Sequence, residues 1–332
     1  MNRRAHELPV LPGRLQRLAD ELEDEHVPAL HGAPDMVGAL VELAYALRPQ
    51  LHEGRVPTYG VLLPPDSFEL VNGGIVGEQV ELTAVGELDL QFARRFADGV
   101  TSFAIRTGES ISHVACFGRN MAEEYDLVGL QAQVGGVIVQ RHGSGQVRVF
   151  GPAGVVRWNG IDWRHDPPVD AWIGRLRTVA GDRLAVEGVR PLLRFAIHEL
   201  GGRRIGATLI WRPTDRPAPE RRFESLVHHA PRLRLAHVGE EAAIAQALSQ
   251  TDGAAMFDVD ATLTALGVRL APSTEAEQSI GAMEGMRHTS AIRYSHDDPD
   301  AVVIVVSDDG PVTLMYAGRA ITAADPADER IG

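Results

Sequence analysis

The sequence predicts an α/β (α+β) protein of two domains: a mixed central sheet flanked by helices, preceded by a strand-rich α+β domain. Three observations support this prediction. The chain has 332 residues, more than one ordinary domain requires. Strand patterns separated by glycine turns dominate residues 59–163. After residue 168, helical and strand patterns alternate, which is typical of helices packed around one sheet.

The first half begins with two predicted helices, at residues 14–26 and 33–51, where apolar residues recur at helical spacing. Strand-forming segments then follow at 59–65, 77–85, 101–117, 134–151 and 154–163. Residues 101–117 and 134–151 each contain a polar glycine turn between two apolar runs, which predicts a β-hairpin. Pro167 and Pro168 interrupt regular structure, so we expect domains at 1–170 and 171–325.

The second half alternates between the two periodicities. Helices are predicted at 168–181, 186–202, 239–253, 273–286 and 287–298. Strands are predicted at 204–213, in a hairpin at 254–268, and as two strands within 301–318. The apolar run that follows residue 300 is long enough for a strand buried on both faces.

Composition excludes several classes of function. The formal net charge of −13 argues against a nucleic-acid-binding surface, which would need a basic stripe. All 32 basic residues are arginine, which excludes any mechanism that depends on a lysine. No apolar run approaches the ~20 residues that cross a bilayer, and no secretory leader is recognised, so we expect a cytoplasmic protein without membrane contact. The single cysteine, Cys116, lies in an apolar run and is expected to be buried.

Two short segments of the second half place small or acidic residues beside strands. In the segment RRIGATLIW, Gly206 and Ala207 allow a ligand or another backbone to approach the strand. In TDGAAMF, Asp252 and Gly253 lie between a helix and a strand, where a carboxylate can hold a divalent metal and glycine lets a phosphate approach the main chain. Taken alone, the first segment is better explained as a core strand and the second as a turn.

Two further segments supply phosphate-binding chemistry. In GMRHTSA, Arg287 and His288 stand at the start of a predicted helix, where free N–H groups and the helix dipole favour anions. In VVSDDG, a buried strand ends at Ser307 and two aspartates. Asp252 precedes Arg287 by 35 positions and Arg287 precedes Ser307 by 20, with strand, helix and strand between them. This order suits a nucleotide site better than four unrelated turns.

With these motifs, residues 185–320 resemble the diadenylate cyclase (DAC, or DisA nucleotide-binding) family. That family pairs an Asp-Gly-Ala motif with an Arg-His-Arg motif and a Val/Ile-rich strand ending in Ser-Glu-Glu. The matching residues here are Asp252, Gly253, Ala254, Gly285, Arg287, His288, Ala291 and the segment VIVVSDD. The segment RRIGATLIW is similar to the family's first core strand.

The resemblance implies a homodimer, or a higher homo-oligomer, that joins two ATP molecules into cyclic di-AMP with Mg²⁺ or Mn²⁺. Its implied catalytic residues are Asp252, Arg287 and His288. Its implied nucleotide-binding residues are Gly206, Ala207, Gly253, Ala254, Gly285, Met286, Thr289 and Ser307. The implied metal ligands are Asp252, Asp308 and Asp309. The bound molecule is expected to be ATP or cyclic di-AMP.

Four positions depart from the family pattern: Thr289 replaces the second arginine, Met286 replaces a threonine, and Asp308 and Asp309 replace two glutamates. Loss of a charged donor to a transition state typically costs about 10²- to 10³-fold in rate. The sequence therefore leaves two functions open, a cyclase and a non-catalytic sensor of a nucleotide or cyclic dinucleotide. In a third interpretation, the N-terminal domain, a candidate sensor or regulatory domain, carries the main function and the second domain only dimerises.

Overall fold

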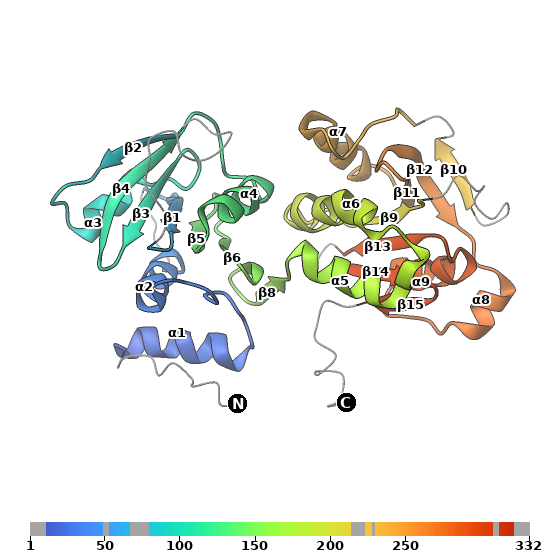
Figure 1. Ribbon diagram of the computed structural model, residues 1–332, viewed down its shortest axis with the longest axis horizontal. Helices are drawn as coiled ribbons and strands as arrows, with labels where there is room; N and C mark the ends of the chain where they lie inside the picture. The colour runs from blue at the N-terminus through green and yellow to red at the C-terminus, as the bar shows by residue number, and fades with distance from the viewer. Residues whose placement is uncertain are drawn as a thin grey trace. The chain divides into compact units, whose positions relative to one another are not determined.

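The computed structural model describes residues 11–48, 53–66, 80–213, 223–227, 230–307 and 312–321. The chain divides into two compact units, Met1–Pro168 and Val169–Gly332, and each contains its own sheet (Figure 1). The division falls at the Pro167-Pro168 pair, two residues before the boundary expected from the sequence.

The first unit is built on an eight-stranded sheet with the order β2-β4-β3-β1-β5-β6-β7-β8. Its strands are β1 (Tyr59–Leu63), β2 (Val80–Ala84), β3 (Ser102–Thr107), β4 (Ser110–Phe117), β5 (Val137–Arg141), β6 (Val147–Gly151), β7 (Gly154–Trp158) and β8 (Trp163–Asp166). Strand β1 pairs parallel with β3 and antiparallel with β5, and the remaining pairs are antiparallel. The sheet is therefore mixed, with β1 at its centre.

Helices cover both faces of this sheet. They are α1 (Gly13–Asp24), α2 (Met36–Ala46), α3 (Leu90–Ala93), a 3₁₀ turn (Arg94–Phe96) and α4 (Glu124–Val134). Val61 and Leu63 of β1 belong to the core shared with α1 and α2, whereas Leu62 belongs to the core shared with α4. This alternation follows from the two-residue period of a strand. The first unit thus has two apolar cores, one on each face of the sheet.

Buried ion pairs cross the first unit. Glu42 of α2 is fully buried and accepts hydrogen bonds from Arg94 Nε and Nη2 (2.9 and 2.8 Å), Arg106 Nη1 (2.5 Å) and the Tyr59 hydroxyl (2.5 Å). Burial, and then the charge of Glu42, raise the pKa of Tyr59. Because each buried charge has a partner, the network avoids the cost of an isolated buried ion.

A second buried guanidinium links α4 to the sheet. Arg157 of β7 bonds to Glu124 at the start of α4, with Nε 2.8 Å from Oε2, and forms a further ion pair with Asp166 of β8. A third, Arg141 of β5, has backbone partners instead: its Nε lies 2.6 Å from the Pro57 carbonyl oxygen, and its Nη1 lies 3.2 Å from that of Ala46 at the end of α2. Arginine side chains therefore tie both helical layers to this sheet.

The second unit contains a seven-stranded sheet with the order β10-β12-β11-β9-β13-β14-β15. Its strands are β9 (Ala207–Trp211), β10 (Phe223–Val227), β11 (Ala254–Phe257), β12 (Leu263–Leu270), β13 (Val302–Val306), β14 (Thr313–Tyr316) and β15 (Arg319–Ile321). Strand β9 is central, parallel to β11 and antiparallel to β13. The mixed sheet flanked by helices that the sequence predicts is confirmed.

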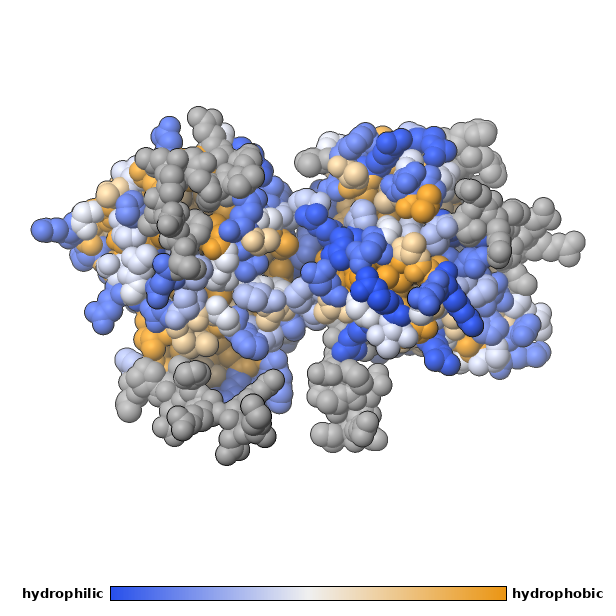
Figure 2. Space-filling model, viewed as in Figure 1, coloured by the Kyte–Doolittle hydropathy of each residue, from blue (hydrophilic) through white to orange (hydrophobic). Residues whose placement is uncertain are grey.

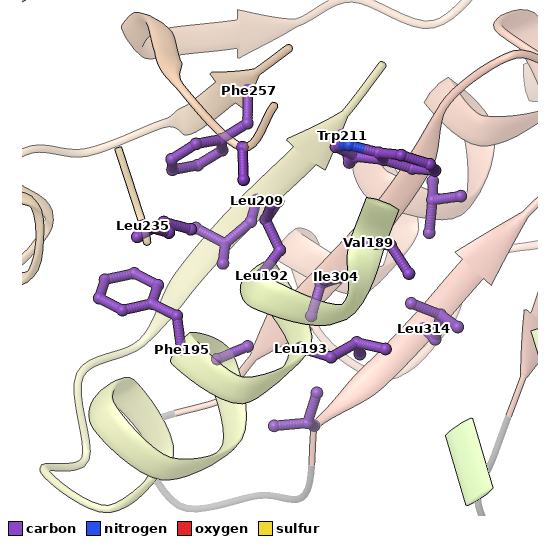
Figure 3. Close-up of a cluster of buried hydrophobic side chains, with 14 of the residues drawn as sticks. Val189, Leu192, Leu193, Phe195, Leu209, Trp211, Leu235, Phe257, Ile304 and Leu314 are labelled. Atoms are coloured by element: carbon purple, nitrogen blue, oxygen red, sulfur yellow. The ribbon is translucent and has the colours of Figure 1, made fainter. Parts of the chain in front are cut away.

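Helices also cover both faces of the second sheet. They are α5 (Val169–Ala180), 3₁₀ turns at Gly181–Arg183 and Val186–Val189, α6 (Arg190–Arg194), a π-helix (Phe195–Gly201), α7 (Val238–Leu248), α8 (Thr274–Ser279) and α9 (Met286–Asp297). Figure 3 shows Leu209 and Trp211 of β9 packed with Leu192 and Phe195 from the α6 side. On the opposite face, Ile210 belongs to the core that includes residues of α9.

The two sheets repeat one topology. Matching β1–β7 in turn with β9–β15 gives the same strand order and the same parallel and antiparallel pairing. The helix before the fifth strand of each series is α4 in the first unit and α9 in the second. Strand β8 extends the first sheet by one strand. The chain therefore contains two units with equivalent sheets.

Several local predictions from the sequence are wrong. Residues 186–202 form a 3₁₀ turn, an α-helix and a π-helix in succession instead of one helix. Helix α8 ends at Ser279, well short of residue 286, because the backbone of Ile280 is extended, with φ −109° and ψ 113°. Cys116 is exposed, since it points outward from β4 between the buried Ala115 and Phe117.

The visible surface of both units is mostly hydrophilic, with hydrophobic patches (Figure 2). None of the described helices combines the length and the apolar composition that crossing a bilayer would require. The described residues do include large hydrophobic side chains that are exposed, among them Phe96 and, at 91%, Met286. Met286 is one of the residues singled out in the sequence.

Candidate functional site

The central strands of the second sheet bring three of the sequence motifs to one end of the sheet. Ala207 begins β9 and pairs with Val306, where β13 ends. Ala254 begins β11 and pairs with Thr208 of β9. Gly206 directly precedes β9, Gly253 directly precedes β11, and Ser307 directly follows β13. The three residues therefore lie at the same end of the sheet, which we call the site edge.

The Asp-Gly pair at the site edge has a backbone that requires glycine. Gly253 has a φ of +99°, and a Cβ there would lie 2.9 Å from the Gly267 carbonyl carbon and from the Val268 oxygen. Asp252, the residue before it, is exposed. The main chain thus approaches closely at Gly253, while the carboxylate of Asp252 remains open to solvent.

Helix α9 contributes the basic residues. It begins after Gly285, which has a φ of +88°, and no side chain caps its first turn. His288 Nε2 lies 3.3 Å from Thr313 Oγ1, at the start of β14. Thr313 pairs with Val305 near the end of β13, so this contact holds the first turn of α9 against the site edge. Helix N-termini favour anions, because their N–H groups are free and the dipole is positive there.

Charge and burial shape the chemistry of this first turn. His288 is partly buried, and burial, followed by the neighbouring charge of Arg287, lowers its pKa, with Glu284 acting in the opposite direction. Its imidazole is therefore mainly neutral at pH 7, with the exposed guanidinium of Arg287 beside it. An anion bound here would favour protonation of His288, since an opposite charge stabilises the charged form.

Thr289 has a structural role. Its Oγ1 accepts a hydrogen bond from the Met283 N–H at 3.0 Å and lies 3.0 and 3.1 Å from the carbonyl oxygens of Met283 and Gly285, to which it can donate. The hydroxyl therefore stabilises the loop that precedes α9. An arginine in its place would lose these bonds.

Gly285, Met286 and Thr289 line a cavity of about 460 Å³ together with Arg293 and Ser290. Asp252, Arg287 and His288 are not among its lining residues. The structure thus places the predicted residues in two groups, one at the site edge and one around this cavity. Thr313 and Arg293 are missed by the sequence analysis, although Arg293 lies four positions after Thr289, the spacing of one helix face.

A metal ion fits the donor chemistry of the site edge only in part. Asp308 and Asp309, two of the three predicted ligands, lie outside the described residues. Within the described ranges, no cluster of three or more His, Cys, Asp or Glu side chains could hold a metal. One exposed carboxylate, Asp252, remains. That is compatible with Mg²⁺, which usually binds one or two carboxylates together with substrate phosphates and water.

Two family models match this chain, one within each of the two compact units. Residues 194–320 match the family described as DisA bacterial checkpoint controller nucleotide-binding (DAC). Residues 16–166 match the family described as "Probable sensor domain DACNK". No curated protein matches the chain. The DAC match includes every candidate site residue named above.

Two solved structures are similar to this chain. A hypothetical membrane spanning protein from Bacillus cereus is 15% identical, with a TM-score of 0.31, and the match covers 48% of this chain and 82% of that chain. A double mutant of DacA from Staphylococcus aureus is 16% identical, with a TM-score of 0.28, and the match covers 43% of this chain and 90% of that chain. Values this low say nothing about the function of this chain.

Proposed function

Because residues 194–320 form a DAC domain, we propose that this chain is a diadenylate cyclase-like protein that condenses two ATP molecules into cyclic di-AMP and releases pyrophosphate. The observation that carries the proposal is the site edge. Strand register and the His288–Thr313 contact bring Gly206, Gly253 and the first turn of α9 to one end of the sheet.

Each group at the site edge has a chemical role in this proposal. Arg287 and His288 bind the triphosphate and stabilise the charge that develops as pyrophosphate leaves. The backbone at Gly206 and Gly253 allows the nucleotide to lie against the strands. Asp252 orients the attacking hydroxyl by accepting its hydrogen bond. Ser307 donates a further hydrogen bond to phosphate.

The reaction needs two copies of the chain, each holding one ATP. The 3′-hydroxyl oxygen of each ATP forms a bond to the α-phosphorus of the other. The bond from that phosphorus to the bridging oxygen breaks, one pyrophosphate leaves for each new bond, and the hydroxyl proton passes to solvent. We therefore propose a homodimer, or a higher oligomer containing it, as the active form.

We also propose that Asp252 binds Mg²⁺ or Mn²⁺ together with the phosphates, with Asp308 and Asp309 as further candidate ligands. Such an ion would neutralise charge on the phosphates. Removing divalent ions with a chelator should abolish product formation, and Mg²⁺ or Mn²⁺ should restore it. Full activity in excess chelator would contradict this role.

One observation favours a second function, a sensor that binds a nucleotide or cyclic dinucleotide without turning it over. The hydroxyl of Thr289 is engaged with the loop before α9, and it carries no charge for a phosphate. The Thr289→Arg variant tests this point. We expect it to raise cyclase activity if the site is a weakened cyclase, and to leave activity at zero if the protein is a sensor.

The deciding experiment incubates the purified full chain with ATP and Mn²⁺ and measures cyclic di-AMP and pyrophosphate. Asp252→Asn should reduce product formation by about 10²- to 10³-fold. Asp260→Asn, at an exposed position in the turn between β11 and β12, is the matched control and should not. Absence of product from the unaltered chain, together with tight binding of ATP or cyclic di-AMP by calorimetry, would overturn the cyclase proposal and support the sensor.

A further inference from the structure

The first unit contains a cavity of about 510 Å³ between α1, α2 and β7. This volume lies within the range of ordinary small-molecule sites, about 300–1,000 Å³. Six of its seven lining residues fall within residues 16–166, the segment that matches the family described as "Probable sensor domain DACNK". None of the DAC site residues contributes to it.

Two guanidinium groups line one wall of this cavity, those of Arg14 and Arg17 on the first turns of α1. Across the described ranges, neither side chain has a hydrogen bond or an ion pair. This differs from the buried arginines of the same unit, such as Arg94 and Arg157, which are paired with carboxylates. Within the part of the chain that the structure describes, the wall thus offers two guanidinium groups that are not paired with a carboxylate.

Arg17 and Glu21 are four residues apart on α1, a spacing at which an ion pair often forms. Glu21, which also lines the cavity, is engaged elsewhere: its Oε1 accepts a hydrogen bond from Trp163 Nε1 at 2.7 Å. The bond crosses from α1 to the start of β8 and fixes the carboxylate. The indole is an uncharged donor, so this bond orients the carboxylate without neutralising it, and the two guanidinium groups of the wall outnumber its one acidic group.

The remaining lining is apolar and aromatic. Leu18, Ala44 and Leu47 from the two helices face the indole of Trp158 on β7, and all four residues pack on the core beneath. The ring of Trp158 lies 5.0 Å from that of Trp163, centroid to centroid, at an interplanar angle of 43°. The Glu21–Trp163 bond thus also supports the aromatic wall. Apolar walls with a few polar groups are typical of small-molecule sites.

We propose that this cavity binds a small organic anion with an apolar or aromatic body. Arg14 and Arg17 would hold its carboxylate, sulfonate or phosphate group, and Trp158 and Leu47 would contact its body. A cavity of this volume suits a small molecule better than a folded protein or a nucleic-acid duplex. This inference does not rest on the proposed cyclase activity, and its test does not involve ATP.

The test uses two dyes of nearly the same shape, the anionic 8-anilinonaphthalene-1-sulfonate and the uncharged N-phenyl-1-naphthylamine. Each is titrated into the full chain while dye fluorescence and energy transfer from tryptophan are recorded. In the Arg14→Gln/Arg17→Gln variant, we expect the Kd of the anionic dye to rise about tenfold or more, because two charge-assisted contacts are lost. The Kd of the neutral dye should change less than about twofold, since its contacts are apolar.

The control variant is Arg95→Gln/Arg119→Gln, which removes the same charge from exposed positions of the first unit that do not line the cavity. It should bind both dyes as the unaltered chain does. Trp158→Leu should weaken binding of both dyes by similar factors. The four arginines are exposed, so both double variants should remain folded, which thermal unfolding checks.

Either of two results would overturn the proposal. One is an equal loss of anionic dye binding in both double variants, which would indicate a general charge effect. The other is unchanged binding of the anionic dye in Arg14→Gln/Arg17→Gln. If that double variant does not fold, the single variants Arg14→Gln and Arg17→Gln are titrated instead, and each should show part of the same selective loss.

Discussion

The two units of this chain share one strand order but differ at the helix that precedes the fifth strand. Helix α4 follows Glu123 and carries Glu124 and Asp126 in its first turn, whereas α9 begins with Met286, Arg287 and His288. A helix N-terminus that carries carboxylates repels an anion, and one that carries basic groups attracts it. At this equivalent position the first turn of α9 therefore suits a phosphate and the first turn of α4 does not, because function depends on the groups placed on a fold.

The equivalent strand pairs differ in the same way. Arg148 pairs with Gln140 in the first sheet, as Thr313 pairs with Val305 in the second. Arg148 is buried and bonds to Gln140 Oε1 and to the Ala122 carbonyl oxygen. Thr313 instead contacts His288 of α9. In the first unit the buried Arg148 thus occupies the position of Thr313, the residue that contacts the candidate phosphate-binding helix α9 in the second unit.

Each unit also has an Asp-Gly pair before its third strand, and the two aspartates differ. Asp98 Oδ1 accepts hydrogen bonds from the N–H groups of Val100, Thr101 and Ser102, each at 2.8 Å. Partial burial raises the pKa of Asp98, but these bonds outweigh that effect and lower it. Asp252 is exposed. The comparison indicates a structural carboxylate in one unit and an available one in the other.

The largest expected effect concerns the buried network of the first unit. Glu42→Ala would leave Arg94 and Arg106 buried without their carboxylate, so we expect a loss of about 3–5 kcal/mol in unfolding free energy. Denaturant unfolding of the full chain should show this change in the first unit alone. The control, Arg119→Gln, removes an exposed pair and should cost under about 1 kcal/mol. An equal shift in the transition of the second unit would show that the units do not unfold independently.

The next effect separates the two Asp-Gly pairs. Asp252→Asn should reduce cyclic di-AMP formation by about 10²- to 10³-fold without lowering the melting temperature. Asp98→Ala should leave the rate unchanged and destabilise the first unit by about 1–2 kcal/mol, because several N–H groups lose their acceptor. Product assays and thermal unfolding of both variants provide the measurement. A loss of activity in Asp98→Ala at a temperature where it is folded would contradict the distinction.

A third prediction contrasts the paired carboxylates of the first unit with Glu241, a buried residue in the first turn of α7 that has no ion pair within the described ranges. Burial raises its pKa from 4.5 to about 7, with Glu199 adding to the shift and Arg194 opposing it. The folded protein therefore favours the protonated form, and its stability falls as pH rises from 4.5 through 7.

Glu241→Gln removes this titration. We expect the variant to match the parent near pH 4.5 and to exceed it by roughly 1–2 kcal/mol at pH 8, as measured by denaturant unfolding across that range. Glu240→Gln, at the partly exposed neighbour that accepts hydrogen bonds from His237 and the Arg234 N–H, should give no such gain. A gain for Glu241→Gln that is independent of pH would show that burial of the charge is not the cause.

The smallest effect concerns the loop before α9. Thr289→Val keeps the shape of the side chain but removes its hydrogen bonds to Met283 and Gly285, at an expected cost of about 1 kcal/mol. Thr289→Ser keeps the hydroxyl and should cost less. Thermal unfolding and hydrogen exchange at the first turn of α9 give the comparison. Equal behaviour of the two variants would remove the structural role assigned to the hydroxyl.

Much of the second unit follows from its sequence. The run VVIVV, buried throughout as β13, has the continuous apolar character of a strand covered on both faces. The order of the Gly206, Asp252, Arg287 and Ser307 motifs predicts their position at one end of a sheet, because a strand has defined ends and the register aligns them. Short stretches of the sequence thus predict the strands of this unit and the motifs that lie at their ends.

Other features could not be predicted. The π-helix at Phe195–Gly201 has no sequence signal, because it differs from an α-helix only in which carbonyl each N–H selects. The sequence predicts Cys116 to be buried because it lies in the apolar run VACF. The strand places it on the exposed face, between the buried Ala115 and Phe117. Helix α4 was missed as well, and the role of Thr289 depends on a loop whose path the sequence does not specify.

The repeated strand order also bears on how the chain avoids assembling incorrectly, since neighbouring domains of similar topology can exchange strands during folding. Gln140 and Arg141 on β5 occupy the positions that Val305 and Val306 occupy on β13. Within its own sheet, Gln140 donates to the Gly99 carbonyl oxygen, and Arg141 donates to those of Pro57 and Ala46. In the place of β13 both side chains would lose these acceptors, at about 1–3 kcal/mol for each unsatisfied group. This cost would disfavour exchange of β5 and β13 between the two sheets.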